Sequence, residues 1–428
     1  MIAKMLSDLK EEDLRGLLSR DVGITDVLET VNEIVMEVGE KGDEALFAFT
    51  EKFEGARLDE LRVSQEEIDA AYDLVEERLK EALADAADNI FNFHRQQKGR
   101  DLWLSEVAPG VTVGQKTVPL DSVGAYVPGG RASYPSSALM NVIPAKVADV
   151  GRIVVCTPPK ADGTVTPLTL VAADMAGADE IYKLGGAQAI AAMGLGTESI
   201  ERVQKIVGPG NIYVTAAKML LRGSVEIDFP AGPSEVLILA DRTADPGVIA
   251  ADMIAQGEHD PRSISVLVTT DDLMASAVME ELNIQAATSS RSDIIQQSLE
   301  HSAVLLAGDL DEALDFCNAF APEHLEIITA DPMGAFRSIR NAGSVFLGKY
   351  TPVAAGDYAS GTNHVLPTSG YARVFSGLNV DHFTKKISVQ MITDDGLLGL
   401  EETITTLAEA EGLKAHAESV RRRLEPRE

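Results

Sequence analysis

The sequence has little cysteine, a single tryptophan and no long run of apolar residues. Its 428 residues include only Cys156 and Cys317, far apart and each within an apolar stretch, so a disulfide framework is excluded and a reducing cytoplasm is expected. No apolar run approaches the about 18 residues that a membrane-spanning helix needs. The first residues, MIAKMLSDLKEEDL, place acids where a signal peptide has an apolar core. We therefore expect a soluble protein that does not bind a membrane.

Basic residues are scarce as well. The chain has 37 Lys and Arg against 67 Asp and Glu, a formal net charge of −30. Nucleic acid needs a basic surface, so no nucleic acid partner is expected. An anionic cofactor would have to be held locally, by backbone amides and helix N-termini. The length allows two or three domains, each with its own core.

The amino-terminal quarter is predicted to be helical. Residues 1–23 are expected to form a short helical arm, and apolar residues recur at helical spacing over residues 24–54. Ser64 and Glu67 form a capping box that opens a long amphipathic helix, with an apolar stripe reaching Ile90. His94, at the end of this helix, is interpreted as a surface histidine near a helix C-terminus.

From about residue 123 the pattern changes to alternating strands and helices. Strands are predicted at 123–129, 152–159, 180–186, 203–210 and 225–232, and then at 235–241, 263–270, 302–308, 323–330 and 343–348. This alternation predicts parallel sheets covered by helices on both faces. The fold class is therefore α/β, with two Rossmann-like domains joined near Pro230–Ser234.

Glycine-rich turns follow several strands of the first set, at 128–130, 185–186 and 208–211. Such turns lie at the carboxyl ends of strands, where open α/β sheets bind ligands. None completes GxGxxG, and tight-turn geometry explains the glycines equally well. Tyr126, Gln188 and Asn211 are the side chains placed to contact a ligand there.

Histidines and acids outside these turns form two further groups. Gln256 and His259, three apart at a predicted helix end, together with Asp357 and His416 offer two nitrogen and two oxygen ligands, a set suited to zinc. No HExxH or CxxC spacing supports a metal, so spacing alone leaves the site open. Asp357 belongs to GDYASGTNH (356–364), whose glycines predict a loop.

Glu323 and His324 form the clearer acid/base pair. A histidine of near-neutral pKa takes a proton from an alcohol, and a glutamate activates water. The alternative is a surface salt-bridging pair. Cys317 offers a thiol nucleophile six residues earlier, but it lies on the apolar stripe of the predicted helix 310–320, which favours a buried structural thiol. His94, His301 and His382 lack polar neighbours in the sequence and are assigned no function.

Five motifs together resemble the histidinol dehydrogenase family, from about residue 24 to the end. They are FPAGPSEVLILAD (229–241), IAQGEHDP (254–261), FAPEHLEI (320–327), GDYASGTNHVLPT (356–368) and EGLKAHAESV (411–420). The resemblance implies oxidation of L-histidinol to L-histidine in two NAD-linked steps through L-histidinal, the last step of histidine biosynthesis. It also implies a cytoplasmic homodimer with one Zn²⁺ per subunit, in which the carboxyl-terminal tail completes the neighbouring site.

The resemblance also implies a role for each matching residue. His324 is the general base, and Glu323 activates water. The zinc ligands are Gln256, His259, Asp357 and His416, the further substrate contacts are Ser234, His364 and Glu411, and the cofactor contacts are Tyr126, Gln188 and Asn211. Substrate contacts also come from the zinc ligands and His324.

The implied domain organisation has four parts. Residues 1–23 form the arm, 24–125 with 234–375 the first α/β domain, 126–233 the second α/β domain on the NAD side, and 376–428 the exchanged tail. Within the tail, a helical pattern over 398–424 is broken at Glu411–Gly412 and ends in three arginines.

Two alternatives stay open at this point. One is a related zinc- and NAD-dependent dehydrogenase acting on another polar alcohol. The other is a non-enzymatic nucleotide or metal sensor. Intact Glu411 and His416 speak against the first, and the acid/base pair Glu323–His324 speaks against the second.

Overall fold

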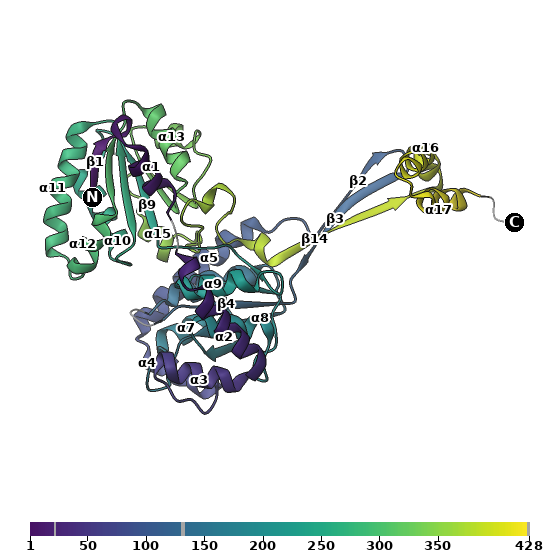
Figure 1. The fold of residues 1–428 in the computed structure, drawn as a ribbon, viewed down its shortest axis with the longest axis horizontal. Coiled ribbons are helices and arrows are strands. Elements are labelled where there is room, and N and C mark those ends of the chain that lie inside the picture. Colours follow the sequence, from purple (N-terminus) through teal and green to yellow (C-terminus); the bar gives the residue numbers. More distant parts are fainter. Residues whose placement is uncertain (21–22, 130–132, 426–428) are drawn as a thin grey trace. The chain divides into compact units, whose positions relative to one another are not determined.

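The computed structural model describes residues 1–20, 23–129 and 133–425, and the chain forms two compact units (Figure 1). Unit 1 comprises Met1–Gln97 and Asp121–His382, and unit 2 comprises Lys98–Leu120 and the chain from Phe383 on. Within the described residues, the search for a helix of membrane-spanning length and apolarity finds no candidate. Four short 3-10 helices, Leu6–Asp8, Ile24–Asp26, Tyr371–Arg373 and Val380–Phe383, connect larger elements.

The first sheet of unit 1 is parallel, in the order β6-β5-β4-β7-β8. Its strands are β4 (Ser122–Tyr126), β5 (Arg152–Thr157), β6 (Glu180–Lys183), β7 (Lys205–Val207) and β8 (Glu226–Ile227). The connecting helices are α6 (Pro135–Val147), α7 (Pro167–Ala176), α8 (Gly186–Leu195) and α9 (Ile212–Leu221). The chain order reverses between β4 and β7, and a ligand site is expected beyond the carboxyl ends of such strands. All five strands predicted between residues 123 and 232 are present in this sheet.

The second sheet of unit 1 is also parallel, in the order β1-β11-β10-β9-β12-β13. Its strands are β1 (Ile2–Met5), β9 (Glu235–Ala240), β10 (Ile264–Thr269), β11 (Ala303–Leu306), β12 (His324–Ile328) and β13 (Ser344–Leu347). One face packs on α10 (Pro246–Gly257), α11 (Asp272–Thr288) and α12 (Ser292–Glu300), and the other on α1 (Glu11–Leu18), α13 (Leu310–Phe320) and α14 (Pro332–Phe336) (Figure 1). All predicted strands of this set are present, and the order reverses between β9 and β12.

The amino-terminal segment differs from its prediction. Residues 1–23 were expected to be a helical arm, but β1 pairs in parallel with β11, Ile2 opposite Ala303. Only α1 is an α-helix in this segment, and it packs on α13. Four residues are too few to show a strand periodicity, so the sequence gives no sign of this edge strand.

The helices that follow also belong elsewhere than predicted. These are α2 (Leu28–Lys41), α3 (Asp43–Glu54), α4 (Gln65–Leu74) and α5 (Glu77–Gln97). They pack on α6, α7, α8 and α9, and Val31 and Leu46 share a core with Tyr182. Residues 28–97 therefore join the five-stranded sheet, not the 234–375 domain. Periodicity shows that a helix buries one face, but not which sheet covers that face.

The capping box at the start of α4 is confirmed. Ser64 Oγ accepts from the Glu67 backbone N–H at 3.3 Å, and Glu67 Oε2 accepts from the Ser64 backbone N–H at 2.9 Å. The single long helix predicted from there is instead two helices, because the backbone at Val75 is extended.

Unit 2 contains an antiparallel sheet that the sequence analysis missed. Its order is β14-β3-β2, with β2 (Leu102–Ala108), β3 (Val111–Pro119) and β14 (Thr384–Ile392). Every residue of β2 is exposed, so the strand lacks the alternation of buried and exposed residues that identifies strands. The tail boundary shifts accordingly: residues 376–382 belong to unit 1, and residues 98–120 join the tail.

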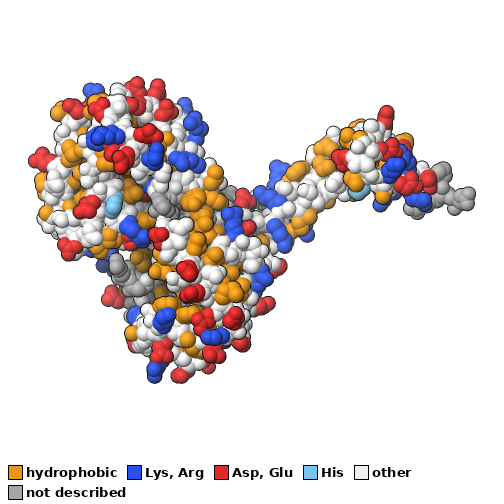
Figure 2. Space-filling view, in the orientation of Figure 1, with side chains coloured by type: hydrophobic (Ala, Val, Ile, Leu, Met, Phe, Trp, Pro, Cys, Tyr) orange, Lys and Arg blue, Asp and Glu red, His pale blue; other side chains and the backbone are white. Residues whose placement is uncertain are grey.

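The two helices of unit 2 confirm the predicted tail pattern. They are α16 (Asp394–Ala410) and α17 (Lys414–Leu424), separated at Gly412, whose φ of 79° ends the first helix. Exposed apolar side chains follow the strands of this unit (Figure 2), among them Leu102, Leu104, Val107 and Met391.

Candidate active site

The acid/base pair lies at the amino end of β12. His324 begins the strand and pairs with Val236 of β9, and Ser234 lies just before β9. These residues therefore sit where the strand order reverses, but at the amino edge of the sheet. Ligand sites of open α/β sheets usually lie at the carboxyl edge.

Glu235, the first residue of β9, fixes both members of the pair. Its backbone N–H donates to Glu323 Oε2 at 2.9 Å, and its Oε1 accepts from the Glu323 backbone N–H at 3.2 Å. His324 Nδ1 lies 3.1 Å from the Glu235 carbonyl oxygen. Because a carbonyl only accepts, Nδ1 carries the proton and Nε2 keeps its lone pair. The unprotonated nitrogen of His324 is therefore Nε2.

His324 Nε2 is buried and has no hydrogen-bond partner among the described residues. Its nearest acid is Asp357, whose Oδ1 lies 3.8 Å away, and Glu323 Oε2 lies 3.6 Å from Nδ1. An orphaned buried nitrogen is rare and points to a role with a ligand. The surface salt bridge considered for this pair is excluded, since Glu323 and His324 are each 5% exposed.

Burial sets the proton affinities of the pair. It lowers the pKa of His324 to about 3, so the imidazole is neutral near pH 7. It raises the pKa of Glu323 well above its ordinary value, and the nearby carboxylates of Glu235 and Asp357 act in the same direction. A carboxylate with a raised pKa is a stronger base toward water.

Asp357 lies on an element that the sequence analysis predicted as a loop. Residues 356–358 form the end of the short helix α15 (Val353–Tyr358), and the irregular chain starts at Ala359. The glycine count was misleading here, because Gly356 packs against Phe346, where an added Cβ would come within 2.7 Å of the ring. Asp357 is thereby held on a rigid turn beside β13.

Gln256 lies in the last turn of α10 and His259 just after it, at a helix end as predicted; Asp245 caps the start of this helix, and Pro246 is its first residue. Gln256 is buried, whereas His259 is exposed at the helix end. The charge of His259 helps to lower the pKa of both His324 and His364, so these three histidines lie close together. Of the three candidate ligands of unit 1, Asp357 and His259 therefore lie near the acid/base pair.

These ligands fit a zinc ion. Although His259 is exposed as a residue, neighbouring protein atoms desolvate its ring and lower its pKa, which leaves a lone pair for a metal. Burial raises the pKa of Asp357 to about 7. A carboxyl buried without a cation is the group that a bound metal would stabilise. Within the described residues, however, no group of three or more His, Cys, Asp or Glu side chains could hold a metal ion. The set in unit 1 is incomplete by itself.

Two predicted residues of the site, Glu411 and His416, belong to unit 2. Glu411 follows α16, and His416 lies in the first turn of α17, and both are exposed. The His416 carbonyl oxygen accepts from Ser419 Oγ at 2.7 Å. Two of the eight predicted substrate contacts are thus carried by the tail.

His364 is held from two sides. Its Nδ1 lies 3.0 Å from the Asp357 carbonyl oxygen, and its Nε2 lies 3.2 Å from Ser137 Oγ of α6. Burial lowers the pKa of His364 to about 4, so the ring is neutral. It donates to Asp357 and accepts from Ser137. His364 therefore links α6, beside the five-stranded sheet, to the helix that carries Asp357.

His94 was predicted at the surface but is fully buried. Its Nδ1 lies 2.8 Å from Gln97 Oε1, and its Nε2 lies 3.2 Å from Asn363 Nδ2. Asn363 Nδ2 also donates to the Met140 carbonyl oxygen at 2.7 Å. The periodicity of α5 did not reveal this contact, because Asn363 lies 269 residues further along the chain.

The predicted cofactor contacts lie around the switch between β4 and β7. Tyr126 ends β4, and its hydroxyl accepts from the Gly186 backbone N–H at 3.1 Å. Asn211 caps α9 and accepts from the backbone N–H groups of Tyr213 and Val214. Gln188, in the first turn of α8, donates to Glu54 Oε1 at 3.3 Å. Gly130 of the first predicted turn, 128–130, lies outside the described residues.

Cys317 is buried within α13, as predicted for a structural thiol. Burial raises its pKa to about 12, so the thiolate is absent near pH 7.

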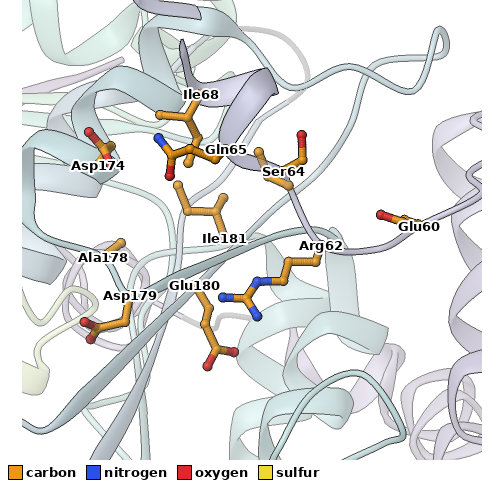
Figure 3. A pocket seen from close by; sticks show the side chains of 11 residues that line it. Glu60, Arg62, Ser64, Gln65, Ile68, Asp174, Ala178, Asp179, Glu180 and Ile181 are labelled. Carbon is orange, nitrogen blue, oxygen red and sulfur yellow. The ribbon is translucent and has the colours of Figure 1, made fainter. Parts of the chain in front are cut away.

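A separate cavity of about 410 Å³ lies against β6 (Figure 3). It is lined by polar and charged side chains including Arg62, Asp174, Asp179 and Glu180, and contains no residue predicted for the site.

Comparison with known proteins gives one consistent result. The family whose sequence model matches residues 18–424 is described as histidinol dehydrogenase. Histidinol dehydrogenase of Methanosarcina mazei is 55% identical over 99% of this chain and 98% of its own, and that of Methanothermobacter thermautotrophicus is 57% identical over 98% and 100%. The crystal structure of histidinol dehydrogenase from Elizabethkingia anophelis has a TM-score of 0.95 at 40% identity, covering 99% of this chain and 98% of that one.

Proposed function

Because the chain belongs to the histidinol dehydrogenase family, NAD-dependent oxidoreductases of histidine biosynthesis, we propose that it converts L-histidinol to L-histidine through L-histidinal at the site around Glu323 and His324. The main support for this proposal is the His324 ring, whose buried Nε2 has no hydrogen-bond partner among the described residues. The distinctive feature of the site is a neutral imidazole beside a buried carboxyl group whose pKa is raised.

In the first step, His324 Nε2 accepts the hydroxyl proton of histidinol while the carbinol carbon loses a hydride. The hydrogen bond from Nδ1 to the Glu235 carbonyl oxygen holds the ring and stabilises the positive charge that forms. The imidazole is neutral before reaction, so Nε2 has a lone pair available for the proton.

In the second step, Glu323 takes a proton from water, and the resulting hydroxide adds to the aldehyde carbon of histidinal. The hydrate anion formed in this way then loses a second hydride, which leaves the carboxylic acid, and this acid releases its proton to give the carboxylate. Glu323 keeps its orientation through the hydrogen bond from the Glu235 backbone N–H. Burial of both residues keeps bulk water from the reactive aldehyde.

We propose Gln256, His259, Asp357 and His416 as zinc ligands and Tyr126, Gln188 and Asn211 as contacts of NAD. When bound, zinc orients the substrate through its imidazole and amine nitrogens, and NAD accepts the hydride of each step. Ser234, His364 and Glu411 contact the substrate. Desolvated His259 and Asp357, together with the switch between β4 and β7, support these assignments.

We also propose a cytoplasmic homodimer with one zinc site per subunit. Two of the proposed substrate contacts, Glu411 and His416, are exposed in unit 2, and apolar side chains of its strands are exposed as well. A second copy of the chain would cover those side chains and receive the two polar ones.

The test mixes purified protein with L-histidinol, NAD and zinc and follows the absorbance of reduced nicotinamide. Two equivalents per histidinol, lost on chelation and restored by zinc, are expected. One equivalent would mean that the aldehyde step fails and that Glu323 does not have its proposed role. No reduction by folded, zinc-loaded protein would overturn the proposal and favour another polar alcohol as substrate.

A further inference from the structure

We propose that Arg20 and Glu235 are positioning residues that hold Glu323 and His324 in their reactive arrangement. The proposal rests on the proposed roles of that pair. It gives the amino-terminal segment a part in the reaction, although Arg20 precedes Glu323 and His324 by about 300 residues in the sequence.

Arg20 and Glu235 form a buried ion pair. Arg20 Nε lies 2.9 Å from Glu235 Oε2, and the two side chains are only 4% and 1% exposed. A buried ion pair contributes little to stability, because removing both charges from water costs about as much as their attraction returns. Such a pair therefore calls for a reason other than stability.

The guanidinium group of Arg20 is anchored by further contacts. One guanidinium nitrogen donates to the Phe320 carbonyl oxygen at 2.7 Å, and another donates to the Leu17 carbonyl oxygen at 3.2 Å. The guanidinium carbon lies 3.7 Å from the centre of the Phe320 ring. Arg20 thus joins the end of α1, the end of α13 and the start of β9. The peptide from Phe320 to His324 begins at one of these anchors.

Glu235 contacts Glu323 and His324 through three of its groups. Its side chain accepts from the Glu323 N–H, its own N–H donates to the Glu323 carboxylate, and its carbonyl oxygen accepts from His324 Nδ1. The ion pair with Arg20 and hydrogen bonds from the backbone N–H groups of Ser369 and Gly370 together hold the side chain that makes the first contact. The Phe320–His324 segment is therefore held at Phe320 by Arg20 and at Glu323 by Glu235.

This geometry has a chemical consequence. A base displaced by 1 Å from its reactive position can lose about 100-fold in rate without loss of binding. Loss of the ion pair would loosen Glu323 and His324 together. We therefore expect kcat to fall for both steps while zinc content and the KM values for histidinol and NAD stay nearly constant.

The experiment uses the full-length, zinc-loaded enzyme. Arg20→Met with Glu235→Gln removes both charges together, which avoids leaving one buried charge alone. Arg15→Met with Glu11→Gln is the matched control, since it removes an exposed ion pair of the same segment. Thermal melting and zinc content are measured for each, followed by kcat and KM with histidinol and with histidinal.

We expect the Arg20/Glu235 double variant to fold and bind zinc, with KM values within about three-fold of the wild type and kcat lowered about 100-fold for both substrates. The control should match the wild type. A folded double variant with kcat within two-fold of the wild type would overturn the proposal, as would a selective rise in KM.

Arg20→Lys keeps the cation but loses the planar fork that reaches two carbonyl oxygens. It should have intermediate kcat, and full kcat in this variant would also overturn the proposal. It decides the matter if the double variant fails to fold. Failure of the proposed function is recognised separately, by a wild-type enzyme that does not reduce NAD or by full activity in Glu323→Gln and His324→Ala.

Discussion

Glu235 and Glu323 each accept a hydrogen bond from the backbone N–H of the other, across the amino ends of β9 and β12. The exchange ties the orientation of the Glu323 carboxylate to the pairing of two neighbouring strands. Its position is therefore set by the sheet and not by a flexible side chain, which suits a group that must activate one water molecule.

Glu323→Gln should separate the two oxidation steps. The amide keeps the shape of the side chain but cannot take a proton from water, so histidinal oxidation should fall by about 10² to 10⁴-fold, while histidinol oxidation to histidinal should be spared. Each step is measured separately by supplying either substrate with NAD. An equal loss in both steps would contradict the assigned division of roles.

His324→Ala should abolish most of the alcohol oxidation. Without Nε2 no side chain accepts the hydroxyl proton, and a loss of about 10² to 10⁴-fold in kcat is expected. The measurement is single-turnover NAD reduction with histidinol at saturating zinc. An unchanged rate would assign the base to another residue, and the comparison with Glu323→Gln would show which step changed.

His416→Asn should lower the zinc content of the purified protein without affecting its fold, because His416 is exposed in unit 2. Metal analysis after dialysis against a weak chelator makes the comparison. His301→Asn, which alters an exposed histidine after α12, is the control and should retain zinc. Full zinc occupancy in His416→Asn would remove His416 from the ligand set.

His94→Phe should destabilise the protein by about 1 to 3 kcal/mol, because it leaves a buried amide hydrogen of Asn363 without its acceptor. The neighbouring His364 should also lose order, so that kcat falls as well. Thermal melting and kcat are measured together. A variant as stable and as active as the wild type would show that the contact of His94 with Asn363 has no role.

His382 should make the protein acid-sensitive. Burial, helped by Lys205, lowers the pKa of His382 to about 4, whereas the unfolded chain takes up this proton near pH 6.5. A lowered pKa of a base means that its stabilising contribution is present above pH 6.5 and is lost as the pH falls toward 4.

His382→Gln should therefore lose about 2 kcal/mol less stability than the wild type between pH 7 and pH 5. Thermal melting at several pH values gives the comparison, and His301→Gln serves as an exposed control. Parallel acid curves for the His382 variant and the wild type would contradict the expectation.

The sequence predicts the strands of unit 1 well because they are short apolar runs between turn residues. The residues 152–159 and 235–241 are of this kind, and both form buried strands. It predicts the site where chemistry needs particular residue types, as at Glu323 and His324. Glu235 carried a signal that was overlooked, since a carboxylate directly before VLILA is rarely buried without a partner.

Other features left no signal in the sequence. Nothing near Arg20 shows that it meets Glu235, and nothing near His94 shows that it meets Asn363, because contacts between distant segments depend on the packed fold. The amphipathic pattern of 28–97 predicts buried faces but not their sheet. β1 and β2 escaped detection because one is too short and the other is fully exposed.

The pairing of β1 with β11 has a consequence for synthesis. Ile2 leaves the ribosome about 300 residues before its partner Ala303, whereas the five-stranded sheet and its helices draw on residues 28–227 alone. Since chains fold from the amino end as they emerge, the half carrying Tyr126 and Asn211 can form first. During that interval β1 has no partner strand, because β11 has not yet been synthesised. The acid/base pair reaches its final arrangement once β12 pairs with β9 and Arg20 forms its ion pair with Glu235.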